Sequence, residues 1–156
     1  MARPMDLRRI ATSEIIAAVG GLLLAVGIFL PWYSPNQDNA NANVNGVRDA
    51  VSAFDAHSIL RWLLLLAALA PIILLWIVIR DHELSWPRGE MTAVVGIIAF
   101  GLTAYVGLID RPGEPPSQIS LGIGWYLSFL GTILIAAGGA TRASTSERPR
   151  KPPGVL

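Results

Sequence analysis

The stretch WLLLLAALAPIILLWIVI, residues 62–79, decides the fold class of this chain. It has no charged side chain, and eighteen residues of α-helix rise about 27 Å, close to the roughly 30 Å of a bilayer hydrocarbon core. Three further stretches lack charge in the same way, at residues 15–37, 91–109 and 115–141. The sequence therefore predicts an all-α membrane protein with four transmembrane helices, at about 13–32, 58–79, 91–109 and 119–140.

The connections between these spans are too short to fold alone, so we expect one domain. It covers residues 1–140 and forms an antiparallel four-helix transmembrane bundle. Residues 141–156 contain three prolines and four basic residues, a composition that does not bury a core. We predict that this basic tail is disordered.

The arginines predict the orientation of the chain in the membrane. Nine of the twelve basic residues lie before the first span, between the second and third, or after the fourth: Arg3, Arg8, Arg9, Arg80, Arg88, Arg142, Arg148, Arg150 and Lys151. The positive-inside rule therefore places both termini in the cytoplasm. Eleven arginines against one lysine are typical of a GC-rich genome, which favours a bacterial plasma membrane.

The composition excludes several classes of function. Cysteine is absent, so the chain has no disulfides, thiolate metal ligands or cysteine nucleophiles. The net charge is only +1, and we expect the lipid bilayer, not a nucleic acid, to surround the protein. No phosphate-binding glycine loop or nucleophile elbow is present. We expect no cofactor and no metal.

The longest connection, residues 34–57, is expected on the outer side. Its Asn-rich part, 35–46, predicts a solvated loop, while Asn45-Gly46 between Val44 and Val47 leaves a small hairpin as the alternative. After this turn, Val47, Val51, Phe54 and Ser58 recur at helical spacing. This spacing predicts a short amphipathic helix at the outer surface.

Small residues recur at every fourth position in three spans and predict seams for close helix contact. The seams are Ala17, Gly21 and Ala25; Ala99, Thr103 and Gly107; and Gly124, Ser128, Thr132, Ala136 and Ala140. Lipid gives helices no hydrophobic reason to associate, so close backbone contact and Ser or Thr hydrogen bonds must hold the bundle. We expect packing within one subunit; the alternative is a surface for a second copy or a membrane-protein partner.

Aromatic residues gather near the predicted outer boundary of the membrane. They are Trp32, Tyr33, Trp62, Tyr105, Trp125 and Tyr126. Amphipathic rings are favourable between headgroups and tails, so an interfacial belt is the simplest interpretation. The alternative is an outer cleft for a lipid-like ligand, in which Arg61 reaches an anionic headgroup.

One group of residues has the types that catalysis uses: Asp55, His57 and Arg61, with Asp110 and Arg111 expected nearby. A histidine with a carboxylate partner can transfer protons or bind a metal. The spacing is loose and no second metal-ligand motif accompanies it. We therefore interpret the group as an interfacial ion-pair cluster and expect no catalytic residue.

The motif Phe29-Leu30-Pro31-Trp32-Tyr33, followed by Asn45-Gly46 and Ala53-Phe54-Asp55, resembles a group of small four-helix membrane proteins from actinobacteria. The resemblance covers mainly residues 15–75 and implies topology, because these motifs have no assigned chemistry. The layout, with a longer first outer loop, is also loosely similar to claudin-type tetraspan proteins. The W-GLW-C-C signature of claudins is missing here, so no barrier or channel function carries over.

Two functions follow as expectations. The first is a non-enzymatic accessory or scaffold protein that associates through its small-residue seams and presents residues 34–57 outside. The alternative is a carrier or facilitator that binds a lipid-like ligand at the outer aromatic cluster and uses a kink at Pro71, since proline removes one helix hydrogen bond.

Overall fold

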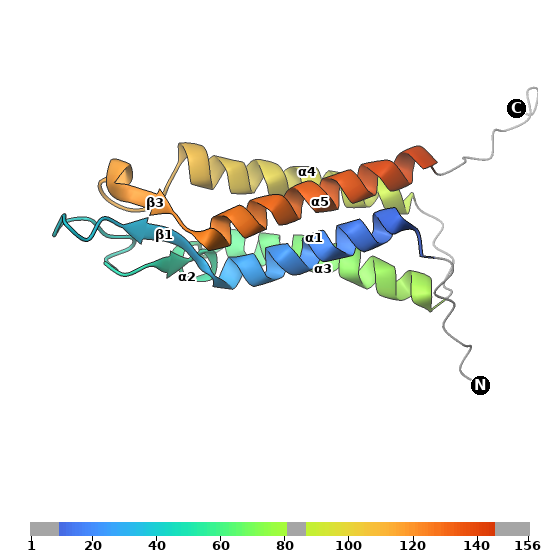
Figure 1. The fold of residues 1–156 in the computed structure, drawn as a ribbon, viewed down its shortest axis with the longest axis horizontal. Helices are drawn as coiled ribbons and strands as arrows, with labels where there is room; N and C mark the ends of the chain where they lie inside the picture. Colours follow the sequence, from blue (N-terminus) through green and yellow to red (C-terminus); the bar gives the residue numbers. More distant parts are fainter. Residues whose placement is uncertain (1–9, 81–86, 146–156) are drawn as a thin grey trace, which may run out of the picture.

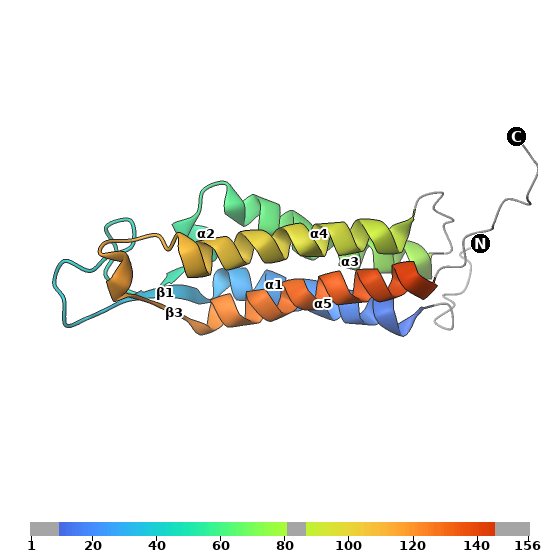
Figure 2. The ribbon, with the colours of Figure 1, turned by 90° about the horizontal axis from the view of Figure 1, so that it is seen from above.

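The computed structural model describes residues 10–80 and 87–145. Four long helices lie antiparallel: α1 (Thr12–Phe29), α3 (Leu60–Ile79), α4 (Arg88–Ala104) and α5 (Ile123–Thr145) (Figures 1 and 2). A π-helix, η2 (Tyr105–Ile109), continues α4. By length and composition, all four, with η2 as part of the third, are apolar and long enough to cross a membrane, which confirms the predicted helical class and the four candidate spans.

The ends of the helices differ from the predicted ends. The first helix ends at Phe29, not at residue 32, and α5 begins at Ile123, not at 119, because the residues in between form strands. At its other end α5 continues to Thr145, so residues 141–145 of the predicted disordered tail are helical. The rest of that tail, together with Arg3, Arg8 and Arg9, lies outside the described residues.

A three-stranded antiparallel sheet, which the sequence did not predict, covers one end of the bundle. Its strands are β1 (Pro31–Pro35), β2 (Val51–Ser52) and β3 (Ile119–Leu121), in the order β2-β1-β3. Tyr33 pairs with Val51 on one side and with Leu121 on the other. We call residues 31–57 and 110–122 the cap, and the bundle end beneath it the sheet end (Figure 1).

The cap contains the hairpin that was the alternative for residues 44–47. Val44 and Val47 exchange backbone hydrogen bonds of 2.8 and 2.9 Å, and Asn45 (φ 50°) and Gly46 (φ 82°) form the turn. The predicted amphipathic helix is reduced to α2 (Ala53–Ala56), because Val51 and Ser52 pair with β1. A 3₁₀ turn, η3 (Pro116–Gln118), precedes β3.

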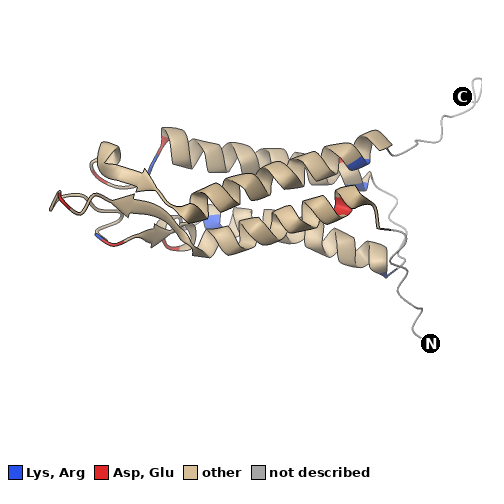
Figure 3. Cartoon of the chain, viewed as in Figure 1, with Lys and Arg blue, Asp and Glu red and all other residues tan. Residues whose placement is uncertain are grey.

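Charged residues gather at the two ends of the bundle (Figure 3). The end opposite the cap holds the first residues of α1 and the last residues of α5, and we call it the terminal end (Figure 1). Helix α5 packs against both α1 and α4, and α1 also packs against α3. Helices α3 and α4 contact each other less closely than these pairs, so one side of the bundle is loosely packed.

The contact between α1 and α5 is built on glycines seven residues apart. Gly27 of α1 lies against Gly124 of α5, and Gly20 lies against Gly131. One further heptad along α5, Gly138 lies against the backbone of Ser13 and Ala17. Because glycine has no side chain, the two backbones approach closely along the full length of both helices.

Candidate functional site

The first predicted site residues, Trp32 and Tyr33, are fully buried where the cap joins the bundle. The Trp32 indole Nε1–H donates a 2.8 Å hydrogen bond to the carbonyl oxygen of Gly27 in α1. The Tyr33 hydroxyl donates to the carbonyl oxygen of Val106 in η2, at 3.2 Å. Both rings therefore fasten β1 to two of the helices.

The Tyr33 hydroxyl also lies 2.9 Å from Nε2 of His57, and the two rings meet edge to face. A hydroxyl has one proton. If Tyr33 donates that proton to Val106, its oxygen accepts a hydrogen bond from His57 in the neutral tautomer that carries its proton on Nε2. Burial raises the pKa of Tyr33, against the opposing effect of Arg111. Burial lowers the pKa of His57, against the opposing effect of Asp110. Both effects keep this buried pair uncharged at neutral pH.

Asp55 is directed toward another partner. Its carboxylate accepts a 2.6 Å hydrogen bond from the Ser52 hydroxyl, which in turn accepts from the Asp55 backbone N–H at the start of α2. In the described part of the chain, Asp55 thus supports Ser52, the N-cap residue of α2, and makes no hydrogen bond with His57. No group of three or more His, Asp or Glu side chains that could hold a metal occurs among residues 10–80 and 87–145.

Arg61 and Trp62, at the sheet end of α3, form a second group. The Arg61 guanidinium lies 4.8 Å from the ring centre of Phe54 and 5.4 Å from that of Trp62, and it donates to the carbonyl oxygen of Phe54 at 3.1 Å. Phe54 also stacks on Phe29 of α1. Arg61 therefore joins α2 to the bundle.

Trp125 and Tyr126 of α5 form a third group. Trp125 is 4% exposed, stacks on Phe129 at 4.8 Å and donates a 3.0 Å hydrogen bond to the carbonyl oxygen of Thr103. Tyr126 is 55% exposed on the surface of α5. Tyr105 and Trp62 are exposed as well.

The prediction of an interfacial belt is therefore wrong for Trp32, Tyr33 and Trp125, because protein and not headgroup surrounds their rings. Their N–H and O–H groups donate hydrogen bonds to backbone carbonyl oxygens inside the fold, so these groups need no water as a partner. The two predicted outer groups, the aromatic residues with Arg61 and the set of Asp55, His57 and Arg61, divide in the structure into separate packing groups around His57, Arg61 and Trp125.

Most of the predicted seam residues lie at contacts within the chain. Gly21 faces Ala68 and Pro71 of α3, and Gly107 faces the indole of Trp125. Most of the set is buried: Ala17, Gly21, Ala99, Thr103, Gly107, Gly124, Ser128 and Thr132. Ala25 and Ala136 are half-buried, and Ala140 is exposed. The sequence interpretation missed the heptad glycines of the α1–α5 contact, whose seven-residue spacing was the available signal.

The loosely packed side of the bundle contains an apolar crevice between α3 and α4. Toward the sheet end it has a cavity of about 240 Å³, and toward the terminal end one of about 300 Å³. Ala70 and Val95 line both cavities and so join them. The second cavity is lined by Ala70, Ile73, Leu74, Ile77, Arg88, Met91, Thr92 and Val95. Among the described residues, Arg88 is the one charged residue in either lining.

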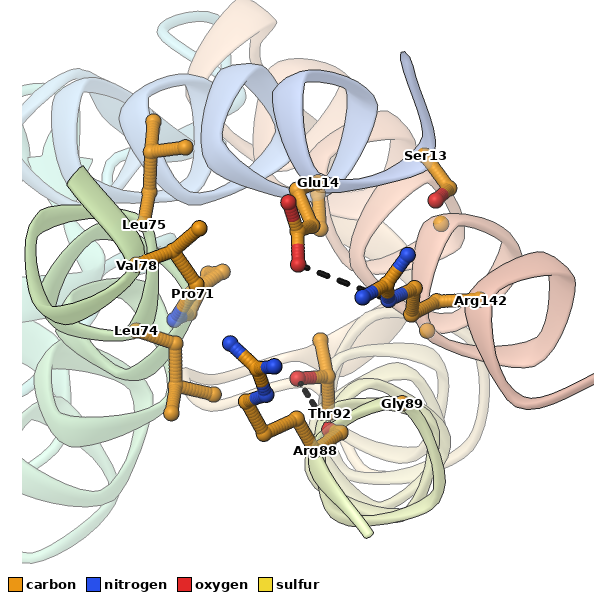
Figure 4. Close-up of a pocket in the computed structure, with 13 residues that line it drawn as sticks. Ser13, Glu14, Pro71, Leu74, Leu75, Val78, Arg88, Gly89, Thr92 and Arg142 are labelled. Atoms are coloured by element: carbon orange, nitrogen blue, oxygen red, sulfur yellow. Dashed lines mark hydrogen bonds and ion pairs between the residues drawn. The ribbon is translucent and has the colours of Figure 1, made fainter. Parts of the chain in front are cut away.

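At the terminal end, the crevice meets a small pocket among all four long helices (Figure 4). Leu74, Arg88 and Thr92 line both. In this pocket Glu14 of α1 forms an ion pair of 3.5 Å with Arg142 of α5. The Arg88 guanidinium points into the pocket beside this pair (Figure 4).

No family model, curated protein or solved structure matches the chain. The function must therefore be argued from the sequence and from the geometry of the cap, the crevice and the pocket.

Proposed function

We propose that the chain is a non-enzymatic accessory or scaffold protein of a bacterial plasma membrane, which presents its cap outside the cell to a membrane-protein partner. The observation that carries the proposal is the build of the cap. Trp32 and Tyr33 fasten it to α1 and η2, so it is a fixed extension of the bundle and not a free loop.

The exposed part of the cap is held by its own side chains. Asn36 and Asn39 each accept a hydrogen bond from the backbone N–H two residues on, and Asn43 accepts from Gly46 N–H. Gln37 donates to the carbonyl oxygen of Arg48, which links two arms of the cap. A surface that is ordered before binding loses less conformational entropy when a partner docks, so this build favours a recognition role.

The arrangement of the other candidate residues gives less support to three alternatives: a lipid carrier at the aromatic residues, an acid/base site at His57 and association through the helix seams. Trp32, Tyr33 and Trp125 are packed inside the fold, and none of the three cavities described above is lined by a residue of the predicted aromatic group. Asp55 and His57 have separate hydrogen-bond partners, so Asp55 does not pair with His57 as the carboxylate of an acid/base site. The seams are occupied by contacts inside one chain, which favours the cap over the seams as the surface for a partner.

The orientation belongs to the same proposal. The arginines of the terminal end and of the flanking segments favour the cytoplasm for that end. The cap then faces outward. Both termini are cytoplasmic in this arrangement.

Photo-crosslinking in cells tests this function. A photoreactive amino acid at Val47, which is 46% exposed on the cap, is expected to give one adduct of defined mass with a membrane protein. The matched position Leu66, 65% exposed on α3, is expected to give lipid adducts only. Charge reversal of the neighbouring Arg48 to Glu should abolish the Val47 adduct. Adducts at Leu66 and none at Val47 would place the partner on the helices and contradict the proposal.

A further inference from the structure

We propose that the crevice between α3 and α4 binds an anionic phospholipid from the leaflet at the terminal end. One acyl chain lies along the crevice, and the phosphate is held by Arg88. This site is separate from the cap and goes beyond the scaffold function.

The shape of the crevice suits an acyl chain. The two cavities follow each other along the helix axes, from Leu63 and Leu102 near the sheet end to Arg88 near the terminal end. Among the described residues, their walls are apolar except for Thr92 and Arg88. The Thr92 hydroxyl donates to the carbonyl oxygen of Arg88, so it needs no partner in the crevice. An apolar slot with one cation at its end is complementary to a lipid, because the slot matches the acyl chain and the cation matches the anionic headgroup.

Among the described charged residues that line the pocket and the crevice, Arg88 is the one that still needs a partner. Arg142 pairs with Glu14, whose carboxylate also accepts from the backbone N–H of Ala11. Within the described residues, the half-buried Arg88 guanidinium has no hydrogen bond or ion pair. Arg88 is also the first residue of α4, where free backbone N–H groups and the helix dipole favour an anion. A phosphate would accept charge-assisted hydrogen bonds from it.

A second copy of the chain fits this crevice poorly. A two-fold axis along the membrane normal brings identical surfaces together at the same depth, so two Arg88 side chains would meet with like charge. An apolar helix from another protein would fill the slot and leave Arg88 without a counter-ion. Anionic lipid satisfies both the apolar walls and the cation, as basic sites between transmembrane helices do for anionic headgroups.

Native mass spectrometry of the full chain in mild detergent tests the site. Phosphatidylglycerol and phosphatidylcholine with identical acyl chains are added in equal amounts. We expect one phosphatidylglycerol to bind in preference, and Arg88→Gln to reduce that preference about tenfold. Arg80→Gln is the matched control, because Arg80 stacks on Trp76 outside the crevice lining. This control should retain the preference.

A second pair of variants tests the acyl chain. Ala70→Phe places a ring where the two cavities join and should reduce binding of both lipids, while Leu69→Phe, one residue away on the exposed face, should not. Glycerol phosphate, which has the charge without the chain, should not displace the bound lipid.

Four results would overturn the site. Three of them are equal binding of the two lipids, an equal loss of the phosphatidylglycerol preference in Arg88→Gln and Arg80→Gln, and a stoichiometric dimer that Ala70→Phe dissociates. Displacement of the lipid by glycerol phosphate would also overturn it, because the anion alone would then occupy Arg88.

Discussion

Gly20 of α1 and Gly131 of α5 lie face to face. A Cβ added to either residue would stand 2.6 Å from the carbonyl oxygen of the other, closer than real Cβ atoms approach. Helices in lipid are held by close packing, so this contact is central to how the bundle stays together.

Gly131→Ala is therefore expected to destabilise the bundle by about 1–3 kcal/mol, because the added methyl overpacks a backbone contact. Gly101 of α4 is the matched control, since a Cβ there meets no atom within 4 Å. Gly101→Ala should be neutral or stabilising, because alanine has the higher helix propensity. Thermal unfolding in mild detergent measures both variants. Equal midpoints for the two would show that the α1–α5 contact tolerates the methyl group.

Tyr33→Phe removes the hydroxyl that joins β1 to His57 and Val106. We expect a loss of about 1–3 kcal/mol, since buried polar groups are left without a partner. Tyr126→Phe, at an exposed ring, should change stability little. Equilibrium unfolding followed by tryptophan fluorescence measures the difference, and a Tyr33→Phe protein as stable as Tyr126→Phe would contradict the role given to this hydroxyl.

The lowered pKa of His57 leads us to expect a loss of stability in mild acid. Burial lowers its pKa below the ordinary 6.5, against the opposing effect of Asp110, so the unfolded chain binds the proton more readily than the folded one. The contribution of neutral His57 to the free energy of unfolding should therefore be fully present above about pH 7. It should fall as the pH drops below 6.5 toward the lowered pKa. Unfolding of the wild type and of His57→Gln, compared at pH 7.5 and 5.5, measures this effect. A wild type that loses no more stability than the variant would exclude His57 as the cause.

Gly46→Ala is expected to loosen the turn of the cap without a steric clash. Gly46 has φ 82° and open space around it, so the cost is the backbone conformation alone, about 1–2 kcal/mol. Faster amide hydrogen exchange in the peptide that contains Val44 and Val47 measures it. Exchange in α5 should stay unchanged, and a general increase would mean that the turn supports the whole fold.

The four helices could be predicted because each is encoded locally. Eighteen consecutive uncharged residues, 62–79, need no information from elsewhere in the chain, so α3 was expected at 58–79 and runs from Leu60 to Ile79. The predicted helix ends were wrong where a residue pairs with a segment far away in the sequence. Pro31–Pro35 pairs with Ile119–Leu121, more than 80 residues away, and two prolines in a five-residue stretch argue against a strand in any local pattern.

The candidate site was less predictable for a related reason. Trp32 and Tyr33 follow an apolar span and so resemble interfacial anchors, but their burial depends on Gly27 and Val106, which only the fold brings near. The crevice depends on a weak contact between α3 and α4, and no spacing in either helix reports how closely its neighbour packs. Arg88 contributed to orientation in the sequence, while its unpaired charge became evident only in three dimensions.

Cysteine labelling in intact cells tests most directly the central claim, that the cap faces outward from the membrane. The chain has no native cysteine, so Asn41→Cys in the cap and Thr145→Cys at the end of α5 each provide one thiol at an exposed position. We predict that a membrane-impermeant thiol reagent labels Asn41→Cys in intact cells and labels Thr145→Cys only after permeabilisation. Labelling of Thr145→Cys but not of Asn41→Cys in intact cells would contradict the account.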